Sequence, residues 1–238
     1  MNTDQITKLY YTIVPLRFIR FHAYRVERFI KKMAQEYDFK GNKILDIGAG
    51  STYHSGHFSK AKYLSQDIIQ NSYNTIDYVY DICSKDEILD SEAVNVILCA
   101  QVLEHLTAPQ SALDEMFRVL KPGGKVYLTT HMAFEEHMLP HDYWRFTEFG
   151  MRLLAKNSKF EVIHFERHGA TANLIHYAFW TWPIRTLFKN RSNVIYYLYA
   201  ILSTPFILIT GILSEFIDYI SKDNGIYTNF EIILKKRE

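Results

Sequence analysis

The segment that most constrains the fold is residues 43–50, which read Lys-Ile-Leu-Asp-Ile-Gly-Ala-Gly. An apolar strand runs here into an acidic residue and two glycines, Gly48 and Gly50. In a doubly wound α/β sheet, the turn after the first strand must let backbone N–H groups approach a nucleotide, and glycine removes the Cβ atoms that would block them. The segment predicts such a turn, but Gly-Ala-Gly alone is a weak signal, so the order of the following elements decides the fold.

Apolar runs typical of buried strands follow at residues 61–66, 76–80 and 94–100. The first run ends at Asp67, near the distance where such folds place an acceptor for ribose hydroxyls. The second ends in Asp81 and Ile82, which suit an adenine amino group and an adenine ring face. These positions predict a nucleoside site along one edge of the sheet.

A helix is predicted over residues 111–120, followed by a Lys-Pro-Gly-Gly turn and a fifth strand at residues 125–130. The expected core face of this helix consists of Leu113, Met116, Phe117 and Leu120.

Taken in order, these segments resemble the class I, Rossmann-like S-adenosylmethionine-dependent methyltransferases, in the type 11-like branch that carries Leu-Asp-Ile-Gly-Ala-Gly, Val-Leu-Glu-His-Leu and Leu-Lys-Pro-Gly-Gly. The resemblance covers roughly residues 40–165 and the last strand. It implies a doubly wound, seven-stranded sheet, mostly parallel with the last strand antiparallel, and S-adenosyl-L-methionine as the cofactor. The implied cofactor residues are Asp46, Gly48, Ala49 and Gly50 at the methionine end, Asp67 at the ribose with Ile68 after it, Asp81 and Ile82 at the adenine, and Ala100 and Gln101 beside the sulfonium.

A nicotinamide-binding protein is the main competitor, because it shares the strand, the glycine turn and the acid. Three features argue against it. The third glycine of the dinucleotide fingerprint is missing, since Ser51, Thr52 and Tyr53 follow Gly50. The Leu-Lys-Pro-Gly-Gly segment has no role in dinucleotide binding, and no Tyr-x-x-x-Lys pair can be placed beside the cofactor edge.

The connection after the glycine turn is short, because only ten residues separate Gly50 from Ala61. That length excludes a full crossover helix with loops, so we expect a short first helix. The polar run from Ser51 to Ser55 is either a lip that binds the cofactor carboxylate or a solvated loop.

Composition limits the number of domains, the class of substrate and the compartment. A chain of 238 residues suits one main domain with an appendage. With 27 basic and 26 acidic residues, no global field attracts nucleic acid, so nucleic-acid substrates are disfavoured. Cys83 and Cys99 fit reduced core residues, and the first residues carry no export signal, which together predict a cytoplasmic protein.

Residues 15–37 predict an amphipathic helix that covers the sheet edge or the cofactor. Its polar side carries basic residues at Arg17, Arg20, Arg25, Arg28, Lys31 and Lys32 against the single acid Glu27. Such a helix either lies on an anionic membrane or presents a solvated face.

A second unusual region lies between predicted strands at residues 160–165 and 226–234, and its residues 194–213 carry no charge. That length suffices to cross a bilayer, but the resemblance makes the two flanking strands antiparallel neighbours in one sheet, which argues against a single span. Because Pro205 and Gly211 interrupt the run, we expect a broken helix or a helical hairpin. Three roles stay open: a membrane-dipping hairpin, a lid over the substrate cleft, or a dimer interface.

The expected organisation is a helical cover at residues 1–40, a methyltransferase core at 41–168, the apolar helical insertion at 169–224 and the final strand at 225–238. Methyltransferases with such an insertion and a Tyr-Trp-Arg-Phe-Thr sequence resemble enzymes of surface-glycan and lipid-linked pathways. This resemblance implies a hydrophobic or lipid-carried acceptor.

Methyl transfer to a hydroxyl requires alignment, exclusion of water and a base. The predicted catalytic residues, on the loops after strands four and five, are His141, Asp142 and His105, and the predicted substrate-binding residues are His131, Tyr143 and Arg145. Structural alternatives stay open, because Glu104 and His105 suit a helix start and Thr147 suits a helix cap. No metal is expected, since the spacing of His131, His137, His141, Glu135 and Glu136 matches no closed site.

We therefore expect a cytoplasmic S-adenosylmethionine-dependent methyltransferase, peripheral on the inner face of the membrane, that acts on oxygen or nitrogen of a small-molecule, glycan or lipid-linked acceptor. The alternative from another class is a cofactor-binding protein without transferase activity, in which the insertion serves membrane attachment or assembly, for example as a homodimer.

Overall fold

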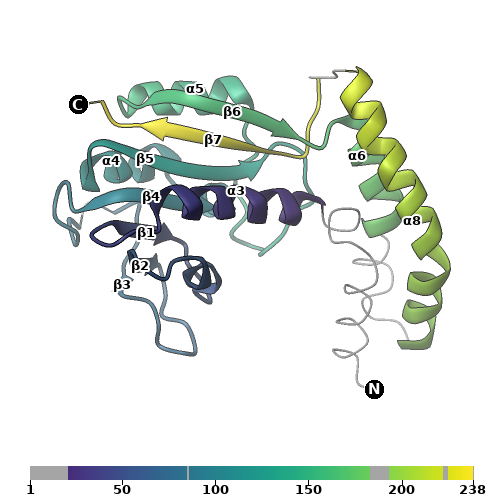
Figure 1. The fold of residues 1–238 in the computed structure, drawn as a ribbon, viewed down its shortest axis with the longest axis horizontal. Coiled ribbons are helices and arrows are strands. Elements are labelled where there is room, and N and C mark those ends of the chain that lie inside the picture. The colour runs from purple at the N-terminus through teal and green to yellow at the C-terminus, as the bar shows by residue number, and fades with distance from the viewer. Residues whose placement is uncertain (1–20, 85, 183–192, 222–224, 238) are drawn as a thin grey trace. The chain divides into compact units, whose positions relative to one another are not determined.

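The computed structural model describes residues 21–84, 86–182, 193–221 and 225–237 (Figure 1). A single seven-stranded sheet has the strand order β3-β2-β1-β4-β5-β7-β6. The first five strands pair in parallel, and β7 is antiparallel to β5, which confirms the predicted fold class. The strands are β1 (Lys43–Ile47), β2 (Lys62–Asp67), β3 (Tyr78–Val79), β4 (Val94–Ala100), β5 (Leu120–His131), β6 (Glu161–His168) and β7 (Asn229–Lys235).

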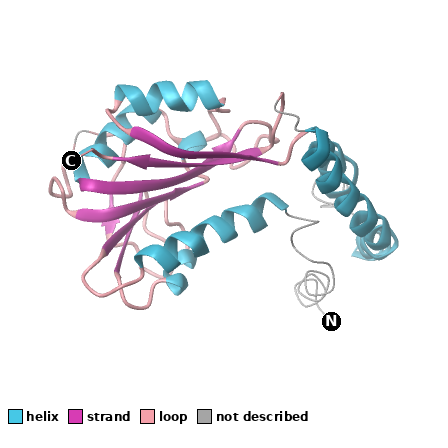
Figure 2. Cartoon of the chain, turned by 45° about the horizontal axis from the view of Figure 1, so that its top comes forward, coloured by secondary structure: helices cyan, strands magenta, loops and turns pink. Residues whose placement is uncertain are grey.

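Helices cover both faces of this sheet, and Figure 2 shows α3 on one face and α5 on the other. The helical elements are α3 (Phe21–Tyr37), η1 (Tyr53–His57), η2 (Leu103–His105), α4 (Pro109–Val119), α5 (Glu148–Asn157), α6 (Thr171–His176), η3 (Tyr177–Thr181) and α8 (Asn193–Ser221). Helix α5 begins as predicted, because the Thr147 hydroxyl accepts a hydrogen bond from the Gly150 N–H at 3.1 Å.

Helix α3 confirms the described part of the predicted N-terminal helix, while residues 15–20 lie outside the described residues. Its apolar face buries Phe29, Ile30 and Met33 against alternate residues of the central strands, including Val96 and Leu98 of β4. That alternation follows the two-residue period of a strand. The Arg28, Lys31 and Lys32 side chains on the opposite face are exposed.

The first crossover is short, as predicted, because η1 has only five residues. Other boundaries differ from the prediction. Leu120 begins β5 rather than ending α4, and the predicted turn at residues 121–124 is an irregularity within β5, where the pairing shifts between Val94 and Val96 of β4. The third predicted strand shrinks to two residues.

The chain divides into two compact units, one formed by Val26–Glu166 and Asn229–Glu238, the other by Arg167–Thr228 with the residues before Val26. In the second unit, α6 packs against α8 as a helical pair (Figure 1). The predicted break at Pro205 is wrong, because α8 runs through this residue. Pro205 lies on the exposed side of the helix, where a carbonyl that loses its N–H partner stays accessible. Within the described residues, Ile201–Ser221 is long and apolar enough to span a membrane.

Candidate active site

The glycine turn after β1 has the left-handed backbone that glycine permits, with φ of +65° at Gly48 and +53° at Gly50. A Cβ atom on Gly48 would lie 2.5 Å from Cγ2 of Val102, so this glycine also admits the loop that follows β4. At Gly50, the nearest described atom to an added Cβ would be the Gly48 carbonyl oxygen at 4.0 Å. Gly48 is therefore required by the close approach of the loop after β4, whereas Gly50 leaves space beside the turn.

Two acids flank this turn. Asp46 is 1 % exposed and accepts a hydrogen bond of 2.5 Å from the Tyr63 hydroxyl. Burial raises the pKa of the Asp46 carboxyl to about 7. Asp67, at the end of β2, accepts hydrogen bonds from the N–H groups of Gly50 at 2.9 Å and Ile68 at 2.7 Å. Asp67 thus fixes the turn through both carboxylate oxygens, and Oδ2, which accepts from the Gly50 N–H, keeps a further lone pair.

The two predicted adenine residues, Asp81 and Ile82, differ in exposure. Asp81 is exposed and accepts a hydrogen bond from the Cys83 N–H at 2.9 Å. Ile82 is 2 % exposed and belongs to the core, so it offers no surface to a ring. Ile68, next to Asp67, is 62 % exposed, and the following Ile69 is 69 % exposed, so accessible aliphatic side chains do lie at this edge.

Gln101 follows β4 with φ of +60°, and its side-chain amide donates to the Thr129 hydroxyl at 2.9 Å. The buried Oε1 atom of Gln101 has no hydrogen-bond partner in the described part of the chain. Together with the open Gly50 and with Asp67, this acceptor fits a cofactor that carries an ammonium and a ribose.

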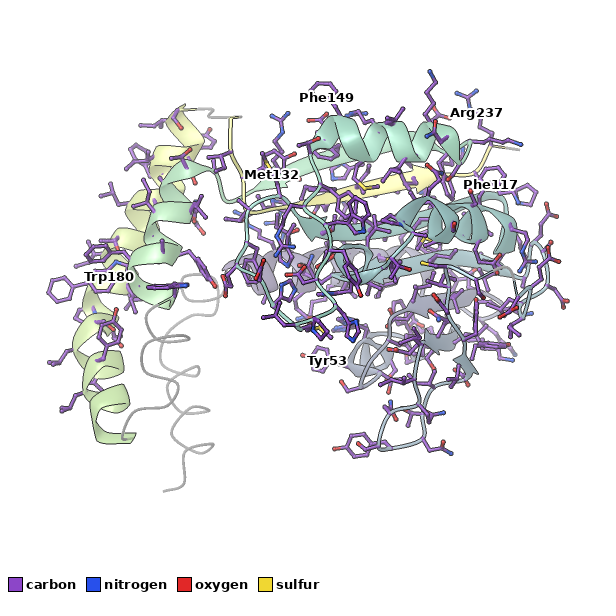
Figure 3. All side chains as sticks on the ribbon, turned by 180° about the vertical axis from the view of Figure 1, so that it is seen from behind. Tyr53, Phe117, Met132, Phe149, Trp180 and Arg237 are labelled. Carbon is purple, nitrogen blue, oxygen red and sulfur yellow. The ribbon has the colours of Figure 1, made fainter. Side chains whose placement is uncertain are left out.

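Segment 132–147, which follows β5, folds back over η2; Figure 3 labels Met132 at its start. The N–H groups of Tyr143 and Trp144 both donate to the Glu104 carbonyl, at 2.9 and 3.2 Å. The Phe146 N–H donates to the His131 carbonyl at 2.9 Å. These bonds bring the histidines that follow β4 and β5 to one edge of the sheet.

The predicted base Asp142 lies inside this segment and pairs with Arg145, and this pair is named the Asp142–Arg145 clamp. Its two oxygens accept hydrogen bonds from the Arg145 guanidinium, each at 2.7 Å, and Oδ2 also accepts from the His137 N–H at 2.9 Å. The Asp142 side chain is 0 % exposed, and the Arg145 guanidinium holds the pKa of this carboxyl well below its usual range. A carboxylate held in this way is a poor base, and Arg145 is engaged rather than free to position a substrate anion.

The other predicted catalytic residues, His141 and His105, contact each other. His141 and Tyr143 are exposed, with His141 Nδ1 3.1 Å from the Tyr143 hydroxyl. His105 Nδ1 lies 2.6 Å from the His141 carbonyl oxygen. A carbonyl only accepts, so Nδ1 of His105 carries the proton and Nε2 keeps a lone pair.

A buried cluster escapes the sequence prediction. Glu104 is fully buried, with Oε2 accepting from the Thr130 hydroxyl at 2.7 Å and Oε1 lying 3.5 Å from Nε2 of His131. Burial raises the pKa of the Glu104 carboxyl. His137 packs edge-on against His131, with ring centroids 5.4 Å apart. The available signal was that β4 and β5 are parallel neighbours, so the residues that follow them share an edge.

The sheet order, the glycine turn and the acid after β2 define a class I, Rossmann-like methyltransferase fold. The sequence profile of the methyltransferase domain family matches residues 18–169. The match covers more than half of the chain, and the protein belongs to this family, whose cofactor is S-adenosylmethionine. The family decides against the nicotinamide interpretation.

Among curated proteins, the ubiquinone biosynthesis O-methyltransferase of Coxiella burnetii is 28% identical over 116 residues, which cover 42% of this chain and 48% of that enzyme. The chain thus spans about half the length of the curated relatives it matches.

Solved structures show the same fold at low identity. The 4+2 cyclase SpnF has a TM-score of 0.56 at 16% identity, over 87% of this chain and 80% of its own. A SAM-dependent methyltransferase from Archaeoglobus fulgidus has a TM-score of 0.52 at 16% identity, over 93% of this chain and 97% of its own.

Proposed function

We propose that the protein is an S-adenosylmethionine-dependent methyltransferase that methylates an oxygen atom of a small, lipid-soluble acceptor. The observation that carries the proposal is the shared edge of the sheet, where the glycine turn with Asp67 faces the same side as the histidines that follow β4 and β5. The name of the Coxiella relative supports oxygen rather than nitrogen as the methylated atom.

Bound S-adenosylmethionine supplies the methyl group on a positively charged sulfur. The protein then has three tasks. Asp67 and the glycine turn hold the cofactor, segment 132–147 closes over the acceptor and excludes water, and His105 accepts the hydroxyl proton at Nε2. As the bond from oxygen to the methyl carbon forms, the bond from that carbon to sulfur breaks, and the proton ends on His105.

The test combines calorimetry with a transfer assay that uses methyl-labelled cofactor and a panel of phenol and catechol acceptors. We expect Asp67→Ala to abolish cofactor binding, while Asp90→Ala, an exposed acid on another loop, binds normally. His105→Gln should bind cofactor normally and lose roughly 100-fold or more in kcat. Binding of NAD, or of neither cofactor, would overturn the proposal.

The distribution of side chains on α8 supports a lipid-soluble acceptor. In a soluble protein the apolar residues of a helix face inward, whereas on α8 most of them are exposed. Its face toward α6 carries small or polar residues at Ser203, Gly211 and Ser214, with Ile207 as the large apolar member. Asp218 of this helix accepts from the N–H groups of Ala172 and Asn173 at 2.9 and 3.1 Å, which satisfies the start of α6. The outward residues are Ile201, Leu202, Ile209, Ile212, Leu213, Phe216, Ile217 and Ile220.

Small residues and hydrogen bonds between helices, with large apolar residues outside, are typical of helices packed in lipid. In water the same outward face would leave a large apolar patch. This pattern supports the proposal that α8 lies in the surface of a membrane, where the acceptor would dissolve. The competing roles, a lid and a dimer interface, are outcomes of the sedimentation experiment described below.

A further inference from the structure

We propose that Glu104, His131 and His137 bind one divalent transition-metal cation at the carboxyl ends of β4 and β5. One carboxylate oxygen of Glu104 and one ring nitrogen of each histidine all lie within 4.8 Å of one another. Oε1 of Glu104 is 3.5 Å from Nε2 of His131. Two ligands of a tetrahedral zinc ion, each about 2.1 Å from the metal, stand about 3.4 Å apart. The pair thus has the separation of two ligands on one ion.

The burial of Glu104 is the second, independent observation. Its side chain is 0 % exposed, and Oε1 accepts no hydrogen bond from the residues that the structure describes, while the Thr130 hydroxyl fixes the other oxygen at 2.7 Å. A buried carboxylate oxygen without a donor is costly, and a cation beside it would offset that cost. The His131 ring is held flat against Phe134, with centroids 4.3 Å apart, so its orientation toward Glu104 is fixed.

His137 is oriented by outer partners in the manner of a metal ligand. Its Nδ1 atom lies 3.2 Å from Oδ2 of Asp142 and 3.2 Å from the Glu135 carbonyl oxygen. Both partners accept hydrogen bonds, so Nδ1 keeps the proton and Nε2 carries the lone pair. A carboxylate behind a histidine is the usual outer arrangement of metal sites. In this arrangement the Asp142–Arg145 clamp orients the His137 ring toward the metal ion.

Two further clusters among the described residues meet the same distance criterion: Glu27 with His54 and His57, and His164 with Glu166 and Glu231. We select the Glu104 cluster because its carboxylate is fully buried, whereas the Glu27 side chain is 27% exposed. Two imidazoles and one carboxylate favour zinc, iron, cobalt or manganese over magnesium or calcium. The expectation of no metal came from spacing along the chain, which does not place Glu104 of η2 beside His131 at the end of β5 and His137 in the segment that follows.

Three protein ligands leave an open position, as in catalytic zinc sites. This consequence rests on the proposed function: an acceptor hydroxyl bound there would have a lowered pKa and lose its proton to Nε2 of His105. The oxygen would then attack the methyl carbon, and the sulfur would leave with the electron pair of its broken bond.

The test is titration of the chelator-treated, full-length protein with Co²⁺, followed by visible absorption and equilibrium dialysis. We expect Co²⁺ to give the absorption bands of a nitrogen- and oxygen-coordinated ion. Glu104→Gln and His137→Gln should each weaken this binding at least tenfold. His54→Gln and His164→Gln, in the other two clusters, should leave it unchanged.

Loss of the absorption bands in His54→Gln or His164→Gln instead would overturn the proposal, as would their absence in the wild-type protein. Circular dichroism and cofactor calorimetry on each variant show whether it has folded. If the chelated protein transfers methyl groups as fast as the metal-loaded protein, the catalytic consequence fails while the proposed function stands. If the Co²⁺ result holds and no transfer occurs, the proposed function fails alone.

Discussion

At the scale of single residues, Asp46 shows what it costs in free energy to bury an acid beside the glycine turn. Its carboxyl is fully buried beside the turn, and Tyr63 supplies a single hydroxyl donor. One neutral donor does not replace the hydration that a carboxylate loses on burial. The folded protein therefore prefers Asp46 protonated, with a pKa of about 7 against an ordinary 3.8.

This preference predicts a pH-dependent stability. Below pH 4 both folded and unfolded states hold the proton, so the contribution of Asp46 is fully present. Between pH 4 and 7 the unfolded chain has lost the proton and the folded protein has not, so the free energy of unfolding falls as pH rises, by up to roughly 4 kcal/mol. Urea unfolding at pH 4 and pH 8 should show this fall in the wild type and a smaller one in Asp46→Asn. Equal falls would contradict the assignment.

Gly48 offers a second test at this scale. Gly48→Ala places a Cβ atom 2.5 Å from Val102 on a backbone with φ of +65°, and should destabilise the protein by roughly 3 kcal/mol or more. Gly56→Ala, whose Cβ atom would meet nothing within 4 Å, is the matched control and should change little. Adding Val102→Ala to Gly48→Ala should recover part of the loss; no recovery would show that backbone strain alone matters.

The sequence predicted Asp46, Gly48, Gly50 and Asp67 correctly as parts of one turn region, because their signal is local: a strand, a turn and an acid in fixed order. It missed Val102 as the neighbour of Gly48 and Tyr63 as the donor to Asp46. Such contacts depend on how strands pair, and the sequence near either residue does not predict them.

At the scale of elements, segment 132–147 decides what the site can do. It has little regular structure, and its shape rests on the Asp142–Arg145 pair and on hydrogen bonds to η2. A helix or strand is predictable from periodicity, but a loop held by side chains is not. This is why the sequence assigned Asp142 to catalysis, whereas the structure makes it part of the support.

The clamp makes a distinguishing prediction. Asp142→Asn and Arg145→Lys should each destabilise the protein by about 2 kcal/mol and reduce kcat/KM by comparable factors, because each breaks the same pair of parallel hydrogen bonds. Thermal unfolding and the methyl-transfer assay measure both effects. If Asp142 were the base, Arg145→Lys would keep most of the activity and Asp142→Asn would lose nearly all of it.

At the scale of the whole molecule, the sheet was the most predictable part. Its central strands are buried on both faces and read as continuous apolar runs, which fixes their positions and order. The insertion was harder, because a helix that is apolar on its outward face shows the same composition as a core helix. Only the packing of α6 on α8 distinguishes the two.

The outward face of α8 predicts membrane binding. Sedimentation with liposomes of neutral and anionic lipids should carry down the wild-type protein, and Ile209→Glu with Leu213→Glu should reduce the bound fraction several-fold. Lys60→Gln with Lys156→Gln, two exposed lysines of the sheet unit, lowers the net charge by the same two units and is the control.

A wild-type protein that stays in solution would contradict membrane binding. If it also ran as a dimer by light scattering, and the two glutamates made it monomeric, the face would be an interface between two copies. A monomer that stays in solution, with altered KM for the acceptor in the glutamate variant, would indicate a lid.

The two ends of the insertion meet, since the Thr228 N–H donates to the carbonyls of His168 and Gly169, at 3.1 and 2.8 Å. The chain leaves the sheet at the end of β6 and returns beside it to begin β7. A segment attached in this way behaves as a cassette: evolution can lengthen, shorten or replace it without shifting the register of any strand. The catalytic sheet can therefore be retargeted to another compartment or another acceptor through one exchange at a single junction.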